Sequence, residues 1–138
     1  MKQALPEPLP DDPLPLLGAW FDEAGMVIRN ATAMTLATVE PDGRPAARMV
    51  ICRGFDPVAG GLVFYTDRES AKGRALAKHA WASCVFHWDA FERQVRGERR
   101  SVAAEHLRVG LAEHLDVAER KLEIVGAEVE IVQPERLL

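Results

Sequence analysis

The spacing of apolar residues changes along the chain, from a helical period near the start to strand-like runs from residue 33 onward. Between Asp12 and Gly25, apolar side chains recur every three or four residues, which is typical of an amphipathic helix. Asp12 is a candidate N-cap, Pro13 suits the first helical position and Gly25 is a candidate stop. The predicted buried stripe of this helix consists of Leu16, Leu17, Trp20 and Phe21.

The segment from Ala33 to Phe55 predicts a β-hairpin, because two apolar or β-branched runs flank the turn sequence Pro-Asp-Gly at 41–43. A second turn at 56–61 leads to another apolar run at 62–66, so three successive antiparallel strands are expected. Further strands are predicted at 82–88, 94–102 and 127–132, which gives five or six in all.

Two more helices are predicted. Ser70 is a candidate N-cap for a short helix of about two to three turns. From Ala103 to Val125, leucines recur at helical intervals and predict a longer helix. Many short strands with short connections are best buried by closure, so the fold class is mainly β with helices, in a small antiparallel barrel.

Length and composition limit the number of domains, the possible partners and the location that can be expected. A chain of 138 residues is expected to form one domain at 12–138, preceded by a proline-rich, flexible arm at 1–11. The net charge of -4 disfavours nucleic acid as a partner. The arm has the pattern of neither a signal peptide nor a membrane span. Cys52 and Cys84 are expected to be buried free thiols, so a cytoplasmic location is predicted.

Basic residues gather around the predicted start of the Ser70 helix. A helix N-terminus offers free backbone N–H groups to an anion, and nearby cations would strengthen a phosphate site. Basic side chains usually form a solvated surface, so the pattern alone is weak evidence for an anion site. The basic residues concerned are Arg48, Arg53, Arg68, Lys72 and Arg74.

Four stretches help to decide between these possibilities: WFDEA, NATAMTLATVEPDGRPAARMVICRGFD, GLVFYTDRESAKGRALA and CVFHWDAFERQVRGE. In order and spacing they resemble the pyridoxamine 5'-phosphate oxidase family, FMN-dependent enzymes that make pyridoxal 5'-phosphate. The resemblance covers roughly Asp12 to Glu98. It implies an FMN-binding split β-barrel, antiparallel and Greek-key-like, that pairs as a homodimer with FMN at the interface.

The resemblance also assigns roles to individual residues. The strand that includes Arg48, Met49, Val50 and Ile51 would run along the flavin, with Arg48 at the FMN phosphate. Tyr65 and Thr66 would line the cofactor, and Ser70 and Lys72 would complete the phosphate cradle. Gln94 would hydrogen-bond the polar edge of the flavin ring, and Arg53 would bind the substrate phosphate. No catalytic acid or base and no metal ligand is implied.

The sequence departs from the family pattern at several points. Arg53 stands where the family usually has lysine, and Ala71 where many members have arginine. Strand alternation places Arg48 and Arg53 on opposite faces unless a bulge or a strong twist intervenes. After Glu98 the family's substrate motifs are not recognisable. The candidates to replace them lie on a helical pattern that also suits a solvated helix face, namely His106, Arg108, His114 and Arg120.

The function implied by the resemblance is oxidation of pyridoxamine or pyridoxine 5'-phosphate in vitamin B6 metabolism. Hydride would pass from the substrate to flavin N5, and oxygen would reoxidise the flavin. The alternative is an FMN-binding split barrel without this activity, such as a flavin carrier or a reductase-like relative. A barrel that has lost the cofactor is a third possibility. None of these functions requires nucleic acid or a membrane.

Overall fold

A computed structural model describes residues 6, 8, 10–56, 61–67, 69–103, 121–124 and 128–132. From residue 99 onward it describes the backbone alone. Most of the predicted arm at 1–11 therefore lies outside the described residues. No helix in the described part is both long enough and apolar enough to cross a membrane.

The described chain forms two α-helices, a short 3-10 helix and eight strands, rather than the five or six strands expected. In chain order they are α1 (Leu14–Val27), β1 (Ala33–Val39), β2 (Pro45–Ile51), β3 (Gly54–Asp56), β4 (Gly61–Tyr65), α2 (Ala71–Lys78), β5 (Trp81–Trp88), η1 (Asp89–Phe91), β6 (Arg93–Ala103), β7 (Lys121–Ile124) and β8 (Glu128–Val132).

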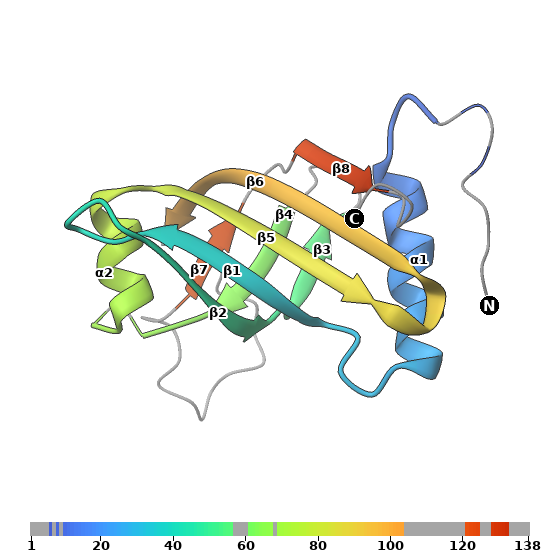
Figure 1. Ribbon diagram of the computed structural model, residues 1–138, viewed down its shortest axis with the longest axis horizontal. Helices are drawn as coiled ribbons and strands as arrows, with labels where there is room; N and C mark the ends of the chain where they lie inside the picture. The colour runs from blue at the N-terminus through green and yellow to red at the C-terminus, as the bar shows by residue number, and fades with distance from the viewer. Residues whose placement is uncertain are drawn as a thin grey trace, which may run out of the picture.

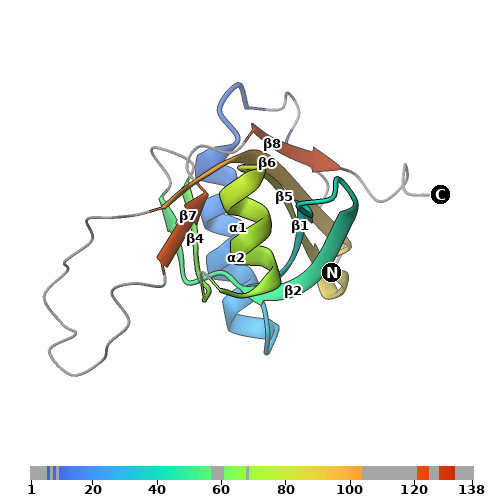
Figure 2. The same ribbon diagram turned by 90° about the vertical axis from the view of Figure 1, so that its left-hand side faces the viewer.

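The strands are joined edge to edge in the order β2-β1-β5-β6-β7-β4-β3, and β8 pairs with β6 outside this path. All their pairings are antiparallel. The long strands β1, β5 and β6 run between the two helices, with α1 at one end of the molecule and α2 at the other (Figure 1). Seen from the α2 end, the strands curve around the helices (Figure 2).

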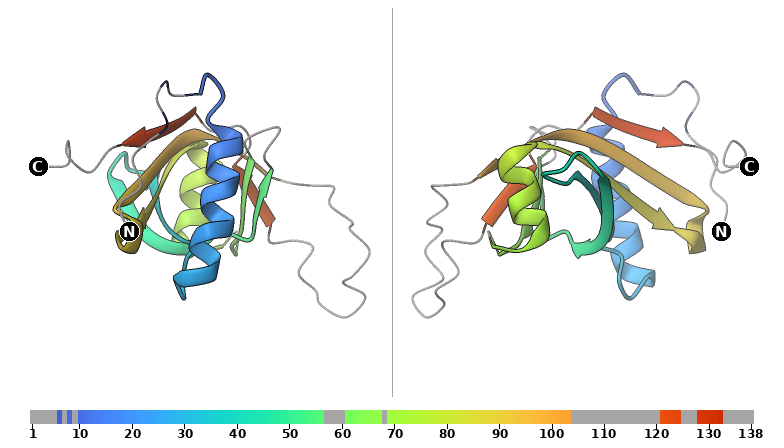
Figure 3. Two further views of the ribbon diagram at one scale, coloured as in Figure 1. Left: turned by 90° about the vertical axis from the view of Figure 1, so that its right-hand side faces the viewer. Right: turned by 60° about the vertical axis from the view of Figure 1, so that its left-hand side comes forward.

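Helix α1 confirms the predicted amphipathic stripe, because Leu17 and Trp20 are buried and Phe21 packs against the same core. Viewed from its own side of the molecule, it stands across one end of the strands (Figure 3, left). The N-cap position is Pro13, while the Asp12 carboxylate accepts a 3.0 Å hydrogen bond from the Leu14 N–H. The predicted stop at Gly25 is wrong, since the helix continues to Val27. An exposed glycine can remain helical at a cost of about 1 kcal/mol.

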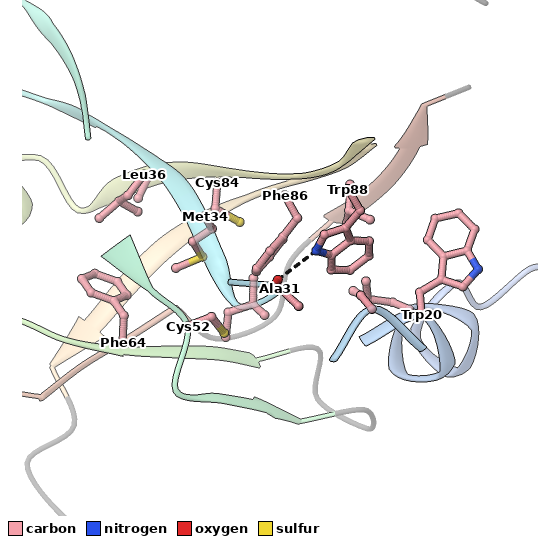
Figure 4. Close-up of a cluster of buried hydrophobic side chains, with 14 of the residues drawn as sticks. Trp20, Ala31, Met34, Leu36, Cys52, Phe64, Cys84, Phe86 and Trp88 are labelled. Atoms are coloured by element: carbon pink, nitrogen blue, oxygen red, sulfur yellow. Dashed lines mark hydrogen bonds between the residues drawn. The ribbon is translucent and has the colours of Figure 1, made fainter. Parts of the chain in front are cut away.

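The core lies between the sheet and α1, and its side chains come from alternate positions of the strands. Met34 and Leu36 of β1 lie on the same buried face as Cys84, Phe86 and Trp88 of the adjacent strand β5 (Figure 4). The Trp88 indole N–H donates to the Ala31 carbonyl oxygen at 2.8 Å. This bond satisfies a polar group that would otherwise be buried without a partner. The core thus fixes the inward face of β1, which matters below.

The expected hairpin forms, but its second strand is shorter than predicted. β1 and β2 pair regularly from Ala33 opposite Ile51 to Val39 opposite Pro45. The Cys52 N–H donates to the carbonyl oxygen of Thr32, the residue just before β1. The Arg53 N–H instead donates to the carbonyl oxygen of Val63 on β4. The chain therefore crosses from one partner to another, and the continuous strand expected through Phe55 is divided into β2 and β3.

The predicted helix from Ala103 to Val125 is wrong at both ends. Ala103 closes β6, and Lys121–Ile124 forms β7, which is held between β4 and β6. Pairing with two neighbouring strands supplies hydrogen bonds that override the local helical spacing. The middle of the predicted helix, with His106, Arg108, His114 and Arg120, lies outside the described residues.

Candidate functional site

The start of α2 is a compact polar corner built around Ser70. Its side-chain oxygen accepts a 3.2 Å hydrogen bond from the Gly73 N–H, which caps the helix as predicted. The Ser70 hydroxyl itself donates to the Asp67 carbonyl at 2.6 Å, so Thr66 is the donor in the 3.1 Å contact between the two hydroxyls. Thr66 is buried and Lys72 is half-buried.

Arg48 lies on the inward face of β2, directly opposite Leu36 of β1. Its Nη1 donates to the Leu36 carbonyl oxygen at 3.2 Å and to the Thr38 hydroxyl at 2.7 Å. Its Nη2 donates to the Glu40 carboxylate at 3.2 Å. Both Nη1 hydrogens are used, while within the described part of the chain Nε–H and one Nη2–H have no acceptor.

The polar corner around Ser70 and the cluster around Arg48 belong to elements at the same end of the molecule. Helix α2 packs against β1, the strand that carries the Arg48 partners Leu36 and Thr38, and buries Gly73, Ala75 and Leu76. At its last turn, the Lys78 ammonium donates to the Pro41 carbonyl oxygen in the β1–β2 turn at 2.9 Å. Helix α2 and the strand pair that carries Arg48 are therefore neighbours at one end of the molecule (Figure 1).

The remaining predicted residues of β2 divide between the two faces of the sheet. Val50 shares the inward face with Arg48 and packs against the core, whereas Met49 and Ile51 point outward. Met49 is 63% exposed and Ile51 is 40% exposed. One strand therefore presents a cation to the interior and an apolar surface to the exterior.

Arg53 follows the point where the chain leaves β1, and its side chain is exposed. The regular ladder ends at Ile51, so simple alternation does not govern the relation between Arg48 and Arg53. Tyr65 is 48% exposed at the end of β4, directly before Thr66. Of the basic cluster, Arg74 is exposed on α2 and Arg68 lies outside the described residues.

Gln94 is not brought next to these groups within the chain. It lies on β6, half-buried, on the face opposite to its buried neighbours Arg93 and Val95. Strands β1 and β5 separate β6 from β2. Three strand spacings correspond to about 14 Å along the sheet, which exceeds the reach of a glutamine side chain.

Sequence reasoning missed two residues of this site, Thr38 and Glu40, which hold the Arg48 guanidinium. The hairpin register contained the signal, because it places Thr38 and Leu36 on the inward face beside Arg48. Around the site, burial raises the pKa of the Cys52 thiol above its usual range. No group of three or more His, Cys, Asp or Glu side chains in the described ranges is arranged to hold a metal ion.

Curated proteins match about two thirds of this chain. A pyridoxine/pyridoxamine 5'-phosphate oxidase from Azorhizobium caulinodans is 52% identical over 87 residues, which are 62% of this chain and 40% of that protein. A second, from Pseudomonas syringae pv. tomato, is 48% identical over 94 residues, 66% of this chain and 43% of that protein. The chain therefore spans about two fifths of the length of these relatives.

Solved structures share the fold. PhzG from Burkholderia lata, in complex with tetrahydrophenazine-1-carboxylic acid, gives a TM-score of 0.62 at 31% identity, covering 70% of this chain and 46% of that one. A pyridoxamine 5'-phosphate oxidase-related, FMN binding protein from Nostoc punctiforme gives 0.71 at 20% identity, covering 89% and 85%. The split β-barrel expected from the sequence is thereby confirmed.

The sequence model of one family, described as pyridoxamine 5'-phosphate oxidase, matches residues 21–133. This range contains both polar groups at the α2 end of the molecule and Gln94. With the family match covering most of the chain, the protein belongs to the pyridoxamine 5'-phosphate oxidase family.

Proposed function

We propose that this protein binds FMN and oxidises pyridoxamine or pyridoxine 5'-phosphate. The observation that carries the proposal is the polar corner at the start of α2, beside the strand pair that holds Arg48, in a chain of this family. A phosphate dianion favours fixed cations and N–H donors, and both are present at this end of the molecule.

The residues of the chain divide the work of holding the cofactor. Arg48 retains two N–H donors for the phosphate after its internal bonds are made. The first backbone N–H groups of α2 have no acceptor within the helix, and Lys72 adds a positive charge beside them. Ser70 and Thr66 close this corner, and Tyr65 lies next to it.

FMN, when bound, supplies the hydride acceptor, and the protein binds and orients both reactants. We assign Met49, Val50 and Ile51 to the strand beside the flavin and Gln94 to its polar edge. Arg53, exposed just after β2, is assigned to the substrate phosphate. Arginine offers a fork of donors where lysine offers a point charge, so both can bind a phosphate with different geometry.

Two copies of the chain complete the site in this proposal. Gln94 is separated from the Arg48 end of β2 by two strands, so a glutamine from a second copy is the simpler source of the amide. The outward face of β2 presents Met49 and Ile51, apolar side chains that a partner would cover. The proposed assembly is a homodimer with FMN at its interface.

The first test is an absorbance titration of the purified protein with FMN, followed by anaerobic addition of pyridoxamine 5'-phosphate. Binding followed by loss of the oxidised flavin absorbance is the expected result. Binding without that loss would support a flavin-binding member of the family that lacks this oxidase activity. Absence of FMN binding would contradict the proposal altogether.

A matched pair of variants tests the phosphate cradle. Lys72→Met should weaken FMN binding about tenfold to a hundredfold, because it removes a charge-assisted hydrogen bond. Arg29→Met removes a positive charge from an exposed side chain just after α1, at the other end of the molecule, and should have little effect. Riboflavin, which lacks the phosphate, should bind all three proteins alike. An equal loss of riboflavin binding in the Lys72 variant would argue against this role for Lys72.

A further inference from the structure

We propose that Glu40 sets the affinity of the phosphate site by holding Arg48 in place and offsetting part of its charge. The inference rests on the proposed function, since it concerns the same anion. Glu40 is itself negative and therefore would not contact a phosphate. It acts through Arg48 and is a positioning residue.

The backbone of the β1–β2 turn fixes Glu40. Its N–H donates to the Arg44 carbonyl oxygen at 2.7 Å, and its own carbonyl accepts from the Gly43 N–H at 2.8 Å. Gly43 has a φ of 88°, in the left-handed region that glycine adopts most readily. The carboxylate thus projects from a closed turn rather than from a loose loop.

One carboxylate oxygen organises the guanidinium and its hydroxyl partner together. Glu40 Oε1 lies 3.2 Å from Arg48 Nη2 and 3.4 Å from the Thr38 hydroxyl oxygen, and that hydroxyl accepts from Arg48 Nη1 at 2.7 Å. The side chains of Arg48 and Glu40 are each only 24% exposed. Their interaction is therefore screened less by salt than that of a fully solvated pair.

The same contact opposes anion binding. A phosphate that uses the free donors of Arg48 would lie close to the Glu40 carboxylate, and the two like charges would repel each other. Glu40 would then stabilise the cofactor-free protein and weaken the hold on FMN. Removing only the charge should shift these two properties in opposite directions.

The test uses Glu40→Gln, because the amide oxygen can accept the same bonds from Arg48 and Thr38 without the negative charge. Asp42→Asn is the matched control, since it removes one acidic charge from the same turn at a side chain that is 62% exposed. FMN and riboflavin are titrated into wild type and both variants at low ionic strength. Thermal unfolding is measured with and without FMN.

We expect Glu40→Gln to tighten FMN binding about tenfold, leave riboflavin binding unchanged and lower the Tm of the cofactor-free protein. Asp42→Asn should match wild type in FMN affinity. Should the amide variant not fold, Glu40→Ala removes the same charge and is expected to increase the ratio of FMN to riboflavin affinity. If wild type binds FMN and the Glu40 variant has the same ratio of FMN to riboflavin affinity as wild type, the role of Glu40 is overturned. A wild type that does not bind FMN would instead refute the proposed function itself.

Discussion

At the scale of single residues, burial changes the acidity of the two cysteine thiols. Both are buried free thiols, Cys52 at 5% and Cys84 at 2% exposure, as the sequence predicted. Burial raises the pKa of Cys84 to about 11, the Gly97 backbone hydrogen bond acts in the opposite direction, and nearby Cys52 raises it further. The folded protein thus holds the thiol proton more tightly than an unfolded chain does.

This difference predicts an alkaline loss of stability. The contribution from Cys84 is complete below the thiol's ordinary pKa of 9.0 and is lost as the pH rises through about 11. It amounts to about 3 kcal/mol at most. Urea unfolding at pH 8 and pH 10.5 should show a smaller decrease in the free energy of unfolding for Cys84→Ala than for wild type. Equal decreases in the two proteins would contradict this assignment.

At the scale of elements, α1 is joined to the sheet by a charged contact as well as by the core. Arg93, at the start of β6, is 5% exposed, and its Nη1 donates to the Glu23 carboxylate at 2.6 Å. The guanidinium carbon also lies 4.4 Å from the ring centre of Trp20 and 5.1 Å from that of Phe91. Such a buried cation is costly unless its counter-charge remains.

Glu23→Gln should therefore lower the free energy of unfolding by about 3 kcal/mol, since it removes the counter-charge from a buried cation. Asp22→Asn, at the exposed neighbouring position, should change it by less than about 0.5 kcal/mol. Thermal and urea unfolding of the two variants would check the difference. If both variants behaved alike, the ion pair would not be what secures α1 to β6.

The sequence predicted those elements whose signals are local. Periodicity and the Ser70 cap were enough for α1 and α2, and the Pro-Asp-Gly turn was enough for the hairpin. The break after Ile51 and the strand β7 depend instead on pairing with β4, which is not encoded in neighbouring residues. The same holds for the site. The roles of Arg48, Ser70 and Lys72 came from the family resemblance and stay predictions, whereas the contacts of Glu40 and Thr38 with Arg48 became visible only with the register.

At the scale of the whole molecule, apolar side chains on the outer face of β2 predict self-association. Met49→Glu would place a charge where the proposed partner packs, and should convert a dimer into a monomer by light scattering of the cofactor-free protein. Ala19→Glu, at an exposed position of α1, is the control and should leave the dimer intact. A wild type that binds FMN tightly as a monomer would contradict the shared site.

The alternation of side chains along β2 makes the anion site depend on the register of the hairpin. Arg48 faces inward and Met49 outward only because the β1–β2 turn sets one register, and a slip of one residue exchanges the two faces. A substitution that slipped the pairing of β2 against β1 by one residue would turn the cation out and the thioether in, whereas a slip of two residues would preserve the parity of the strand. The same register therefore determines both how the hairpin buries its core face and whether Arg48 reaches the anion site.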